Sequence, residues 1–502
     1  MLRKFVTTLF FIIAETVLVY AQQLYVQPVD DSGFRNDCND ISRPCTLRRA
    51  LYVATDGDEL VLKEGNYTSV SGWIADVNNS VTLTGGWDGI DRMPLNINPE
   101  RYPSIIDGMN LTAGLRIEPQ KDVTIRGLTF ARCRSDENGS ALYDFNAAAL
   151  HLVNDVFIDN MVDSNDTYRN GGAVFITGGT LDINESNFTR NGVYAEKNSH
   201  GGAVYAFDTN GTIANTSFIQ NSGWQGSAVG WNAPYGTTMS GTILNCVFRD
   251  NGKKIGRAVS GYGTVESGYI NMMISGSLFE DNSVFNEGAA CYLIASYKQK
   301  IVLKNNRFKK NGDAKSLNIL KMQLVGQMEV YNNVFIDNSV RKSSDDSIVL
   351  LRGIDNSNRG TAMLDYNTFS ENNTTYSVKL NNTSYVQMRN NIFSGTTSAV
   401  YVDSEAHIPI YYNNLDWNVT TRFSGSGSVD DEKNNLTGDP RFARDGWHLQ
   451  AGSAAINSAE CVMLTDEDID RDKRPFGKSC DIGADEFIGS GVMPGIIMYM
   501  LN

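Results

Sequence analysis

The histidines are the first candidates for proton-transfer chemistry, because imidazole is the side chain that titrates nearest neutral pH. The 502-residue chain has 4 histidines, and a role can be suggested for two of them. His200 stands directly before a Gly-Gly-Ala segment and lies close in sequence to Asp208 and Glu196, so His200 is the candidate base, with Asp208 as its neighbour in the site, if the protein is an enzyme. The alternative is a solvent-exposed or hydrogen-bonded His200 without a catalytic role. His448 belongs to a C-terminal pattern described below and is interpreted as structural.

An acidic run near the C-terminus is the candidate metal site. Asp468, Asp470 and Asp472 alternate along this run, and carboxylate oxygens spaced in this way on a turn are the hard ligands that calcium prefers. The run lacks the glycine and the terminal glutamate of a helix–loop–helix calcium site, and Arg471 interrupts it. The competing interpretation is a solvated turn whose carboxylates pair with neighbouring basic side chains. Calcium is therefore the one cofactor that the sequence raises.

A repeat must position these residues. Eight copies of Phe-x-x-Asn follow one another at 27 to 34 residues in nearly constant phase, which indicates a solenoid whose coils pack on their neighbours. A short alternating strand precedes each phenylalanine. The asparagine that ends each copy is expected to turn the chain in the left-handed backbone conformation. The phenylalanines of the eight copies are Phe157, Phe188, Phe218, Phe248, Phe279, Phe308, Phe335 and Phe369.

A second motif in the same phase, Gly-Gly-Ala-Val and its degraded copies, supplies the opposite strand of each coil. Long helical patterns are absent, so the expected fold is all-β, a parallel β-helix in which equivalent residues stack about 4.8 Å apart. Paired asparagines such as Asn305-Asn306 and Asn332-Asn333 end several of the alternating strands and are expected to stack as amide ladders. The copies of the second motif begin at Gly171, Gly201, Gly226, Gly256 and Gly288.

Alternation along the Gly-Gly-Ala strands makes their outer face the candidate ligand surface. If the valine of each strand points inward, then Phe175, Tyr205 and Tyr292 point outward. Exposed aromatic rings stack on sugar rings, so these three residues and Trp231 in a neighbouring coil are the candidate glycan-binding residues. The alternatives are that a loop covers the rings, that the alternation has the opposite phase, or that Trp231 packs a loop.

The N-terminus predicts export. Arg3 and Lys4 precede an apolar run that ends in small residues near Ala21, the pattern of a cleaved secretory signal. A membrane anchor is the alternative, but the run is short and Glu15 interrupts it. The formal net charge of −14 disfavours a nucleic-acid partner.

Seven cysteines fit an exported chain. Cys38 and Cys45 lie together near the mature start, and Cys461 and Cys480 lie together near the end. Each of these two pairs is expected to form a disulfide in an oxidising compartment. The other three are expected to be small buried hydrophobic residues, namely Cys133, Cys246 and Cys291.

The paired motifs resemble the repeats of polymorphic outer-membrane proteins, which are surface adhesins with β-helical passenger regions. The segment from Cys45 to Tyr67 is similar to the opening of right-handed β-helix proteins of the pectin-lyase-like superfamily, a capping helix followed by the first strand. Gly452-Ser-Ala-Ala-Ile-Asn457 and Asp481-Ile-Gly-Ala-Asp-Glu486 resemble the closing module of secreted bacterial β-helix proteins. The resemblance covers residues 24–487 and implies a right-handed parallel β-helix, but it is weak for function, because this scaffold carries lyases, hydrolases, epimerases and adhesins alike.

Function is expected to be non-catalytic. In polysaccharide-cleaving members of the superfamily, the resemblance implies carboxylates and a base on one parallel sheet, and the Gly-Gly-Ala strands offer no such cluster. The expectation is a secreted or cell-surface protein for adhesion or glycan binding, whose partner is an extracellular glycan or cell-surface component and whose mature chain has no transmembrane span. A polysaccharide lyase, hydrolase or epimerase is the second hypothesis, and a spacer without a ligand is the third.

The predicted organisation has five parts. They are a signal peptide at 1–21, an N-terminal cap with the first coils at 22–100, β-helix repeats at 101–430, a C-terminal closing module at 431–487 and a short tail at 488–502.

Overall fold

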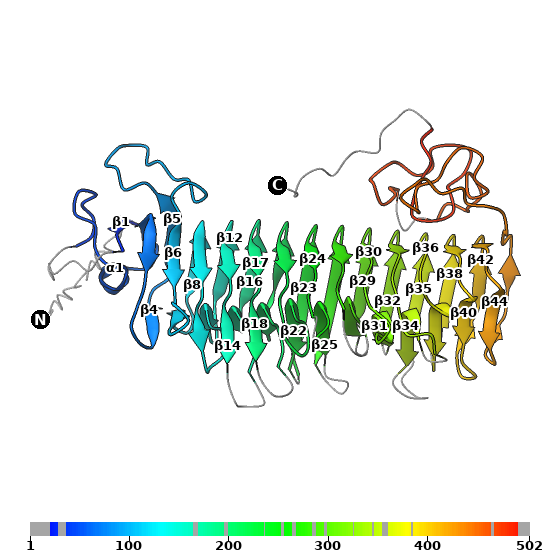
Figure 1. Ribbon diagram of the computed structural model, residues 1–502, viewed down its shortest axis with the longest axis horizontal. Coiled ribbons are helices and arrows are strands. Elements are labelled where there is room, and N and C mark those ends of the chain that lie inside the picture. The colour runs from blue at the N-terminus through cyan, green and yellow to red at the C-terminus, as the bar shows by residue number, and fades with distance from the viewer. Residues whose placement is uncertain are drawn as a thin grey trace, which may run out of the picture.

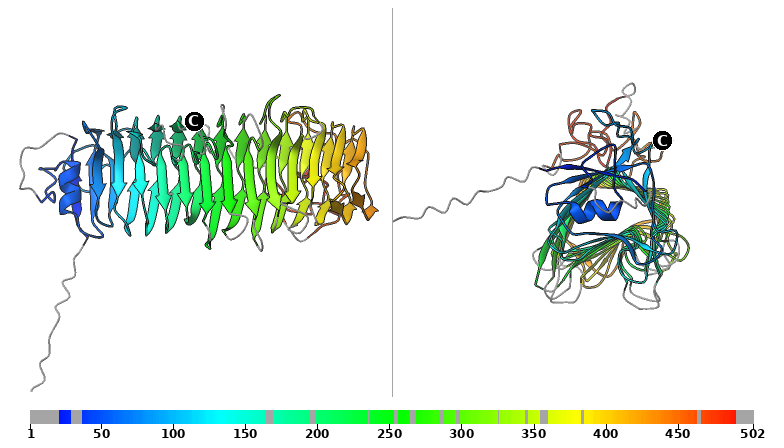
Figure 2. Two further views of the ribbon diagram at one scale, coloured as in Figure 1. Left: turned by 90° about the horizontal axis from the view of Figure 1, so that it is seen from below. Right: turned by 90° about the vertical axis from the view of Figure 1, so that its left-hand side faces the viewer.

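The described chain winds into one long right-handed parallel β-helix (Figures 1 and 2). A computed structural model describes residues 21–28, 37–163, 169–194, 199–234, 236–252, 256–263, 268–283, 288–295, 299–324, 326–343, 346–353, 360–382, 385–462 and 466–489. The predicted signal peptide up to residue 20 and the tail beyond residue 489 lie outside these residues. No helix in the described ranges is long and apolar enough to cross a membrane.

Each coil contributes a strand to each of three long parallel sheets. Sheet A has fifteen strands in the spatial order β1 (Gln23–Val26), β2 (Glu59–Lys63), β5 (Thr82–Trp87), β8 (Asp122–Arg126), β12 (Ala149–Val153), β16 (Thr180–Asn184), β20 (Asn210–Ala214), β23 (Thr238–Leu244), β26 (Tyr269–Ser275), β29 (Lys300–Lys304), β32 (Gln327–Tyr331), β35 (Thr361–Asp365), β38 (Tyr385–Arg389), β42 (Ile410–Tyr412) and β46 (Glu432–Lys433).

Sheet B carries the phenylalanine motif. Its thirteen strands are β3 (Gly65–Tyr67), β6 (Ser104–Asp107), β9 (Leu128–Ala131), β13 (Val156–Ile158), β17 (Asn187–Thr189), β21 (Ser217–Ile219), β24 (Val247–Arg249), β27 (Leu278–Glu280), β30 (Arg307–Lys309), β33 (Val334–Ile336), β36 (Thr368–Ser370), β39 (Ile392–Ser394) and β43 (Leu415–Trp417).

Sheet C carries the Gly-Gly-Ala motif. Its thirteen strands are β4 (Trp73–Val77), β7 (Ala113–Ile117), β11 (Leu142–Asp144), β15 (Val174–Thr177), β19 (Val204–Phe207), β22 (Val229–Ala233), β25 (Val259–Gly263), β28 (Cys291–Ala295), β31 (Asn318–Leu324), β34 (Ser347–Gly353), β37 (Tyr376–Asn381), β40 (Ser398–Val402) and β44 (Thr421–Gly425). Short strands pair at the turns, namely β10 (Arg134–Ser135), β14 (Met161–Asp163), β18 (Gly192–Tyr194), β41 (His407–Ile408) and β45 (Ser428–Val429).

The recurring phenylalanines form one continuous stack inside the coil. Phe157 pairs in register with Phe188, and their rings are parallel with centroids 4.5 Å apart. The stack runs from Phe130 to Phe393 with centroid separations of 4.5 to 5.1 Å, and its rings are fully buried. This confirms the stacking expected from the phase of the motif, in which each ring contributes to a core that no single coil could bury alone.

The asparagines form two buried ladders beside the phenylalanines. The second asparagine of each pair donates to its copy in the next coil, as Nδ2 of Asn306 does to Oδ1 of Asn333 at 3.0 Å, so the expected amide ladder is confirmed. The expectation for the asparagine of Phe-x-x-Asn is wrong in one respect. The left-handed residue is the one before it, for example Arg190 with φ 53°, and Asn191 itself points into the second ladder. The turn therefore costs backbone strain at a variable residue and leaves the asparagine free to satisfy buried main-chain groups.

The two ends of the solenoid are closed differently. Helix α1 (Leu47–Val53) covers the N-terminal end, and the Cys38–Cys45 disulfide lies beside it. Residues after β46 turn back over the outer side of sheet B, where Trp447 packs against Val334 and Ile336, and this module contains the second disulfide, Cys461–Cys480. Both disulfides expected from the sequence are present, and the three remaining cysteines are buried.

Candidate functional site

The outer face of sheet C carries a row of aromatic side chains in register. Tyr143, Phe175 and Tyr205 occupy equivalent positions on β11, β15 and β19, while the preceding valines Val174 and Val204 point into the core. The predicted alternation therefore holds. The rings stack on one another, with centroids 5.4 Å apart for Tyr143 with Phe175 and 5.9 Å apart for Phe175 with Tyr205.

Burial excludes the centre of this row as a sugar platform. Phe175 is only 6% exposed and Tyr205 only 4%, so neither ring offers a free face to a ligand. The expectation that these two residues bind a glycan is therefore wrong in this conformation, although they do point outward. Trp231 is also buried, but it points inward into the core, where Nε1 donates a hydrogen bond to the carbonyl of Thr209 at 2.7 Å. Trp231 is a packing residue.

Tyr292 and His200 belong to a mixed aromatic and basic cluster further along the row. The guanidinium of Arg257 lies 4.2 Å and Nζ of Lys321 4.8 Å from the centre of the Tyr292 ring. Tyr292 meets Tyr262 edge to face at 5.4 Å, and Tyr262 meets His200 in the same way at 5.9 Å. Half-buried Tyr292 therefore binds cationic side chains of its own chain with its ring.

His200 is held neutral in this cluster. Burial, with Arg257 nearby, lowers the pKa of His200 to about 4, and its buried Nδ1 has no hydrogen-bond partner in the described part of the chain. Burial also raises the pKa of Tyr205 to about 12. Asp208 does not complete an acid–base pair, because it follows β19 whereas His200 precedes that strand. A neutral imidazole beside a guanidinium and phenol groups is the chemistry that the cluster offers.

An open pocket lies at the N-terminal end of the same face, where helix α1 meets β4 and β7. It encloses about 380 Å³. The ring of Trp73 lies 6.0 Å from that of Tyr143, so the pocket continues the aromatic row beyond its buried centre. The pocket is lined by Arg48, Tyr52, Ser71, Trp73, Ala75, Asp76, Asn78 and Arg116.

Hydrogen bonds make this pocket a rigid one. Arg48 donates from Nε to the carbonyl of Ile74 at 2.7 Å and from Nη2 to that of Trp73 at 2.8 Å, which ties helix α1 to β4. Arg116 donates from Nε to Oδ1 of Asp76 at 2.9 Å. Tyr52 is 75% exposed, so an aromatic face and paired planar polar groups meet solvent in one concave site.

Sequence reasoning missed this pocket because it lies outside the Gly-Gly-Ala repeat. The signal that was available is that Trp73 and Asp76 follow closely, in sequence, the arginines of the predicted capping helix. What the sequence lacks is any indication that Arg116, one coil later, reaches Asp76. Concave sites of this kind, with an aromatic surface and a few fixed polar groups, are the usual form of small-ligand pockets.

The acidic run in the closing module does not gather its carboxylates around one ion in the expected way. Oδ1 of Asp468 accepts hydrogen bonds from the backbone nitrogens of Asp470 and Asp472, each at 2.8 Å, so it organises the turn. The carboxylate of Asp470 instead forms ion pairs with Arg307 and His448, each at 2.7 Å. The predicted calcium site of Asp468, Asp470 and Asp472 is therefore not the arrangement that the described residues form.

Comparison with known proteins identifies no family and no activity. The sequence matches no protein-family model and no curated protein. Among solved structures, the chain aligns with pectate lyase Pel9A over 93% of its own length and 96% of that chain, at 16% sequence identity and a TM-score of 0.37. A likeness this distant transfers no residue and no reaction, so the architecture rests on the three parallel sheets themselves.

Proposed function

We propose that this chain is a secreted or cell-surface β-helix protein that binds an extracellular glycan, without cleaving it, at the pocket around Trp73. The single observation that carries the proposal is the open, concave site in which Trp73 and Tyr52 stand beside the Arg116–Asp76 pair. An aromatic ring covers the apolar face of a sugar, and fixed carboxylate and guanidinium groups bind its hydroxyl groups.

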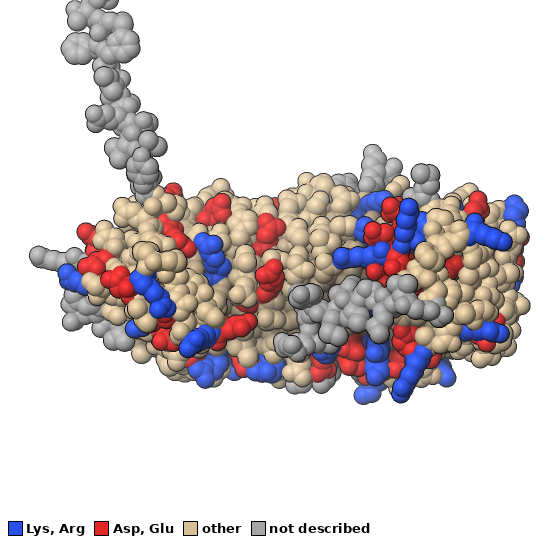
Figure 3. Space-filling view, turned by 90° about the horizontal axis from the view of Figure 1, so that it is seen from above, with Lys and Arg blue, Asp and Glu red and all other residues tan. Residues whose placement is uncertain are grey.

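Location outside the cell is supported by covalent and electrostatic features. Two disulfides near the ends of the described chain persist in oxidising compartments. On the face seen in Figure 3, basic and acidic side chains lie interspersed rather than gathered by sign, which gives a nucleic-acid backbone no continuous basic surface there. The resemblance of the repeats to those of surface adhesins favours the same setting.

A polysaccharide-cleaving enzyme is the second candidate. It is favoured by the grouping of neutral His200 with Tyr262 and Arg257, since a lyase needs a base and a cation near a uronate. The described part of this cluster holds no carboxylate that contacts His200. Burial of its neighbour Tyr205 also leaves a polymer no open path to the imidazole in this conformation.

The experiment that separates the two candidates uses one preparation of the mature protein. It is screened against neutral and uronic-acid polysaccharides, with and without calcium, for binding, for absorbance at about 235 nm from unsaturated products and for new reducing ends. Retention of at least one polysaccharide with neither product signal is the expected result. Product formation that disappears in His200→Ala would establish the enzyme instead.

A further inference from the structure

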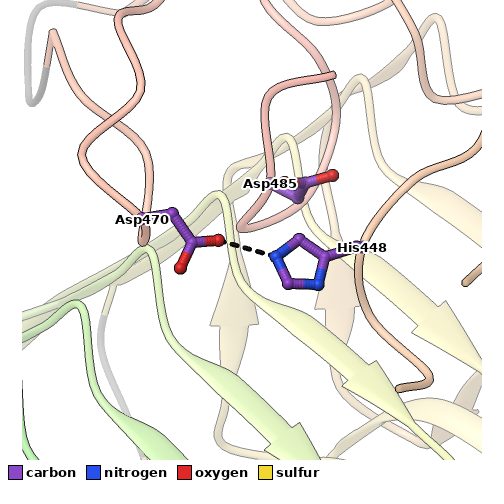
Figure 4. A group of neighbouring side chains, drawn as sticks. All are labelled: His448, Asp470 and Asp485. Carbon is purple, nitrogen blue, oxygen red and sulfur yellow. Dashed lines mark hydrogen bonds and ion pairs between the residues drawn. The ribbon is translucent and has the colours of Figure 1, made fainter. Parts of the chain in front are cut away.

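Three segments of the closing module meet at His448 (Figure 4). His448 follows Trp447, Asp470 belongs to the acidic turn, and Asp485 lies in the last described segment. Each offers one ligand atom, and these three atoms lie within 4.8 Å of one another. The three side chains are separated by up to 37 residues of sequence, so only the folded module brings them together.

The orientation of His448 is fixed from its other ring nitrogen. Nδ1 contacts the carboxylate of Asp445, while Nε2 points at Oδ2 of Asp470 at 2.7 Å. A carboxylate on the far nitrogen of an imidazole is the arrangement that holds metal-ligating histidines, because it places the proton on that nitrogen and leaves the other with its lone pair. Asp445 thus supplies the outer partner of a potential ligand.

Asp485 offers one carboxylate oxygen to the group. It is only 6% exposed, and its Oδ2 accepts a hydrogen bond from the backbone nitrogen of Leu449 at 2.6 Å. Its other carboxylate oxygen receives no hydrogen bond from any described residue. That oxygen is therefore available to coordinate a cation, which would compensate the charge of this largely buried carboxylate.

The groups around His448 have more negative than positive charge, which favours binding of a divalent cation. Asp445, Asp470 and Asp485 bring three carboxylates, and among the described residues the one arginine that contacts this group is Arg307 of β30, which pairs with Oδ1 of Asp470 at 2.7 Å. The guanidinium of Arg307 also lies 4.9 Å from the centre of the Trp447 ring. Without an ion, burial is outweighed by the hydrogen bonds to Asp445 and Asp470, which raise the pKa of His448 to about 10, so a metal ion has to displace a proton from the imidazole. With the imidazole neutral, these groups carry a surplus of two negative charges.

We infer that His448, Asp470 and Asp485 bind a divalent transition-metal ion, with Asp445 as the positioning residue for the imidazole. One nitrogen and two carboxylate oxygens suit zinc or manganese, whereas calcium takes oxygen ligands alone. The ion joins three segments of the closing module to one another, and through Asp470 and Arg307 it joins the module to the solenoid. The site is a cross-link of the fold and lies apart from the glycan pocket.

Metal content and calorimetry test the site directly. The mature protein is stripped with a chelator, dialysed and titrated separately with zinc, manganese and calcium. We expect one zinc or manganese ion per chain, at least tenfold tighter binding than calcium, and a higher melting temperature on loading. Asp485→Asn, which keeps the shape of the side chain, is expected to weaken zinc binding at least tenfold, and His448→Ala to abolish it.

His151 provides a matched control. Its imidazole lies 3.6 Å from Asp122 and 3.3 Å from Asp182 on the surface of sheet A, so it is a histidine between two aspartates that are not buried. His151→Ala is expected to leave zinc binding unchanged. Loading with cobalt(II) gives a second readout, since a visible absorption band from nitrogen and oxygen ligation is expected in the wild type and in His151→Ala but not in Asp485→Asn. Equal binding by wild type and Asp485→Asn, or neither zinc nor manganese bound by wild type, would overturn the site and leave His448 as a protonated partner of its aspartates.

Discussion

Oδ1 of Asn251 accepts two hydrogen bonds from Asn221, one coil earlier, from the backbone nitrogen at 2.9 Å and from Nδ2 at 3.1 Å. Nδ2 of Asn251 in turn donates to the carbonyl of Phe218 at 2.9 Å. One buried amide therefore satisfies main-chain groups of the preceding coil and contacts the next. The ladder fixes the distance between coils with the same side chain that ends each repeat.

Asn251→Asp tests this ladder with a change of a single group. The carboxyl oxygen that replaces Nδ2 faces the carbonyl of Phe218, so a donor is lost and a charge is buried, which is expected to lower the free energy of unfolding by about 2 to 4 kcal/mol. Urea denaturation of the mature protein measures the difference. Asn187→Asp, at an exposed position of β17, is the control and is expected to change stability by less than about 0.5 kcal/mol. Equal effects at the two positions would contradict the role of the ladder.

Phe248→Ala tests the aromatic stack. The ring is fully buried and lies 5.1 Å from Phe218 and 4.7 Å from Phe279, so its removal leaves a cavity between two coils. We expect a loss of about 3 to 5 kcal/mol in unfolding free energy. Phe145→Ala removes a ring that is 53% exposed and is expected to cost little. A cost for Phe248→Ala no larger than that for Phe145→Ala would show that the stack does not hold the coils together.

Asp144 gives the core a dependence on pH. Its carboxyl is fully buried on β11, in register with Ile117 and Ile176, and neither oxygen has a partner in the described ranges. Burial raises the pKa of Asp144 to about 8. Because the unfolded carboxyl ionises near its ordinary pKa, the stability from the protonated form is complete below that value and is lost as the pH rises to about 8, by roughly 1.4 kcal/mol per pH unit.

Asp144→Asn removes this titration. Relative to the variant, the wild type is expected to lose stability steadily between pH 5 and about pH 8, and denaturation curves across this range measure the difference. Glu185→Gln, at an exposed carboxylate, supplies the control for general charge effects. A stability difference between wild type and Asp144→Asn that stays constant from pH 5 to pH 8 would mean that Asp144 is solvated.

The sequence predicted the features that recur in every coil. The phase of the phenylalanines and the alternation around Val174 are local properties, so the stack and the outward direction of Phe175 followed from them. The burial of Phe175 and Tyr205 could not be predicted from this local pattern, because it depends on what packs over the two rings from other coils. The left-handed residue precedes the asparagine for a similar reason, since the amide of Asn191 hydrogen-bonds with the neighbouring coils and Arg190 takes the turn conformation instead.

The sequence did not predict the two sites that lie outside the repeat. Asp470 meets Arg307, 163 residues earlier, because the closing module turns back over sheet B, and no pattern in the acidic run encodes that return. The Trp73 pocket likewise depends on Arg116, which reaches Asp76 from the next coil. Periodicity reveals the contacts between equivalent positions, whereas these contacts join positions that are not equivalent.

The most direct test of glycan binding is calorimetric titration of a retained oligosaccharide into wild type, Trp73→Ala and Trp417→Ala. Trp417 is an exposed tryptophan on β43, far from the pocket along the solenoid, so it controls for the loss of an indole as such. We expect Trp73→Ala to weaken binding about tenfold or more, which corresponds to about 1.4 kcal/mol, and Trp417→Ala to leave the affinity unchanged. Undiminished affinity in Trp73→Ala would contradict the proposed site.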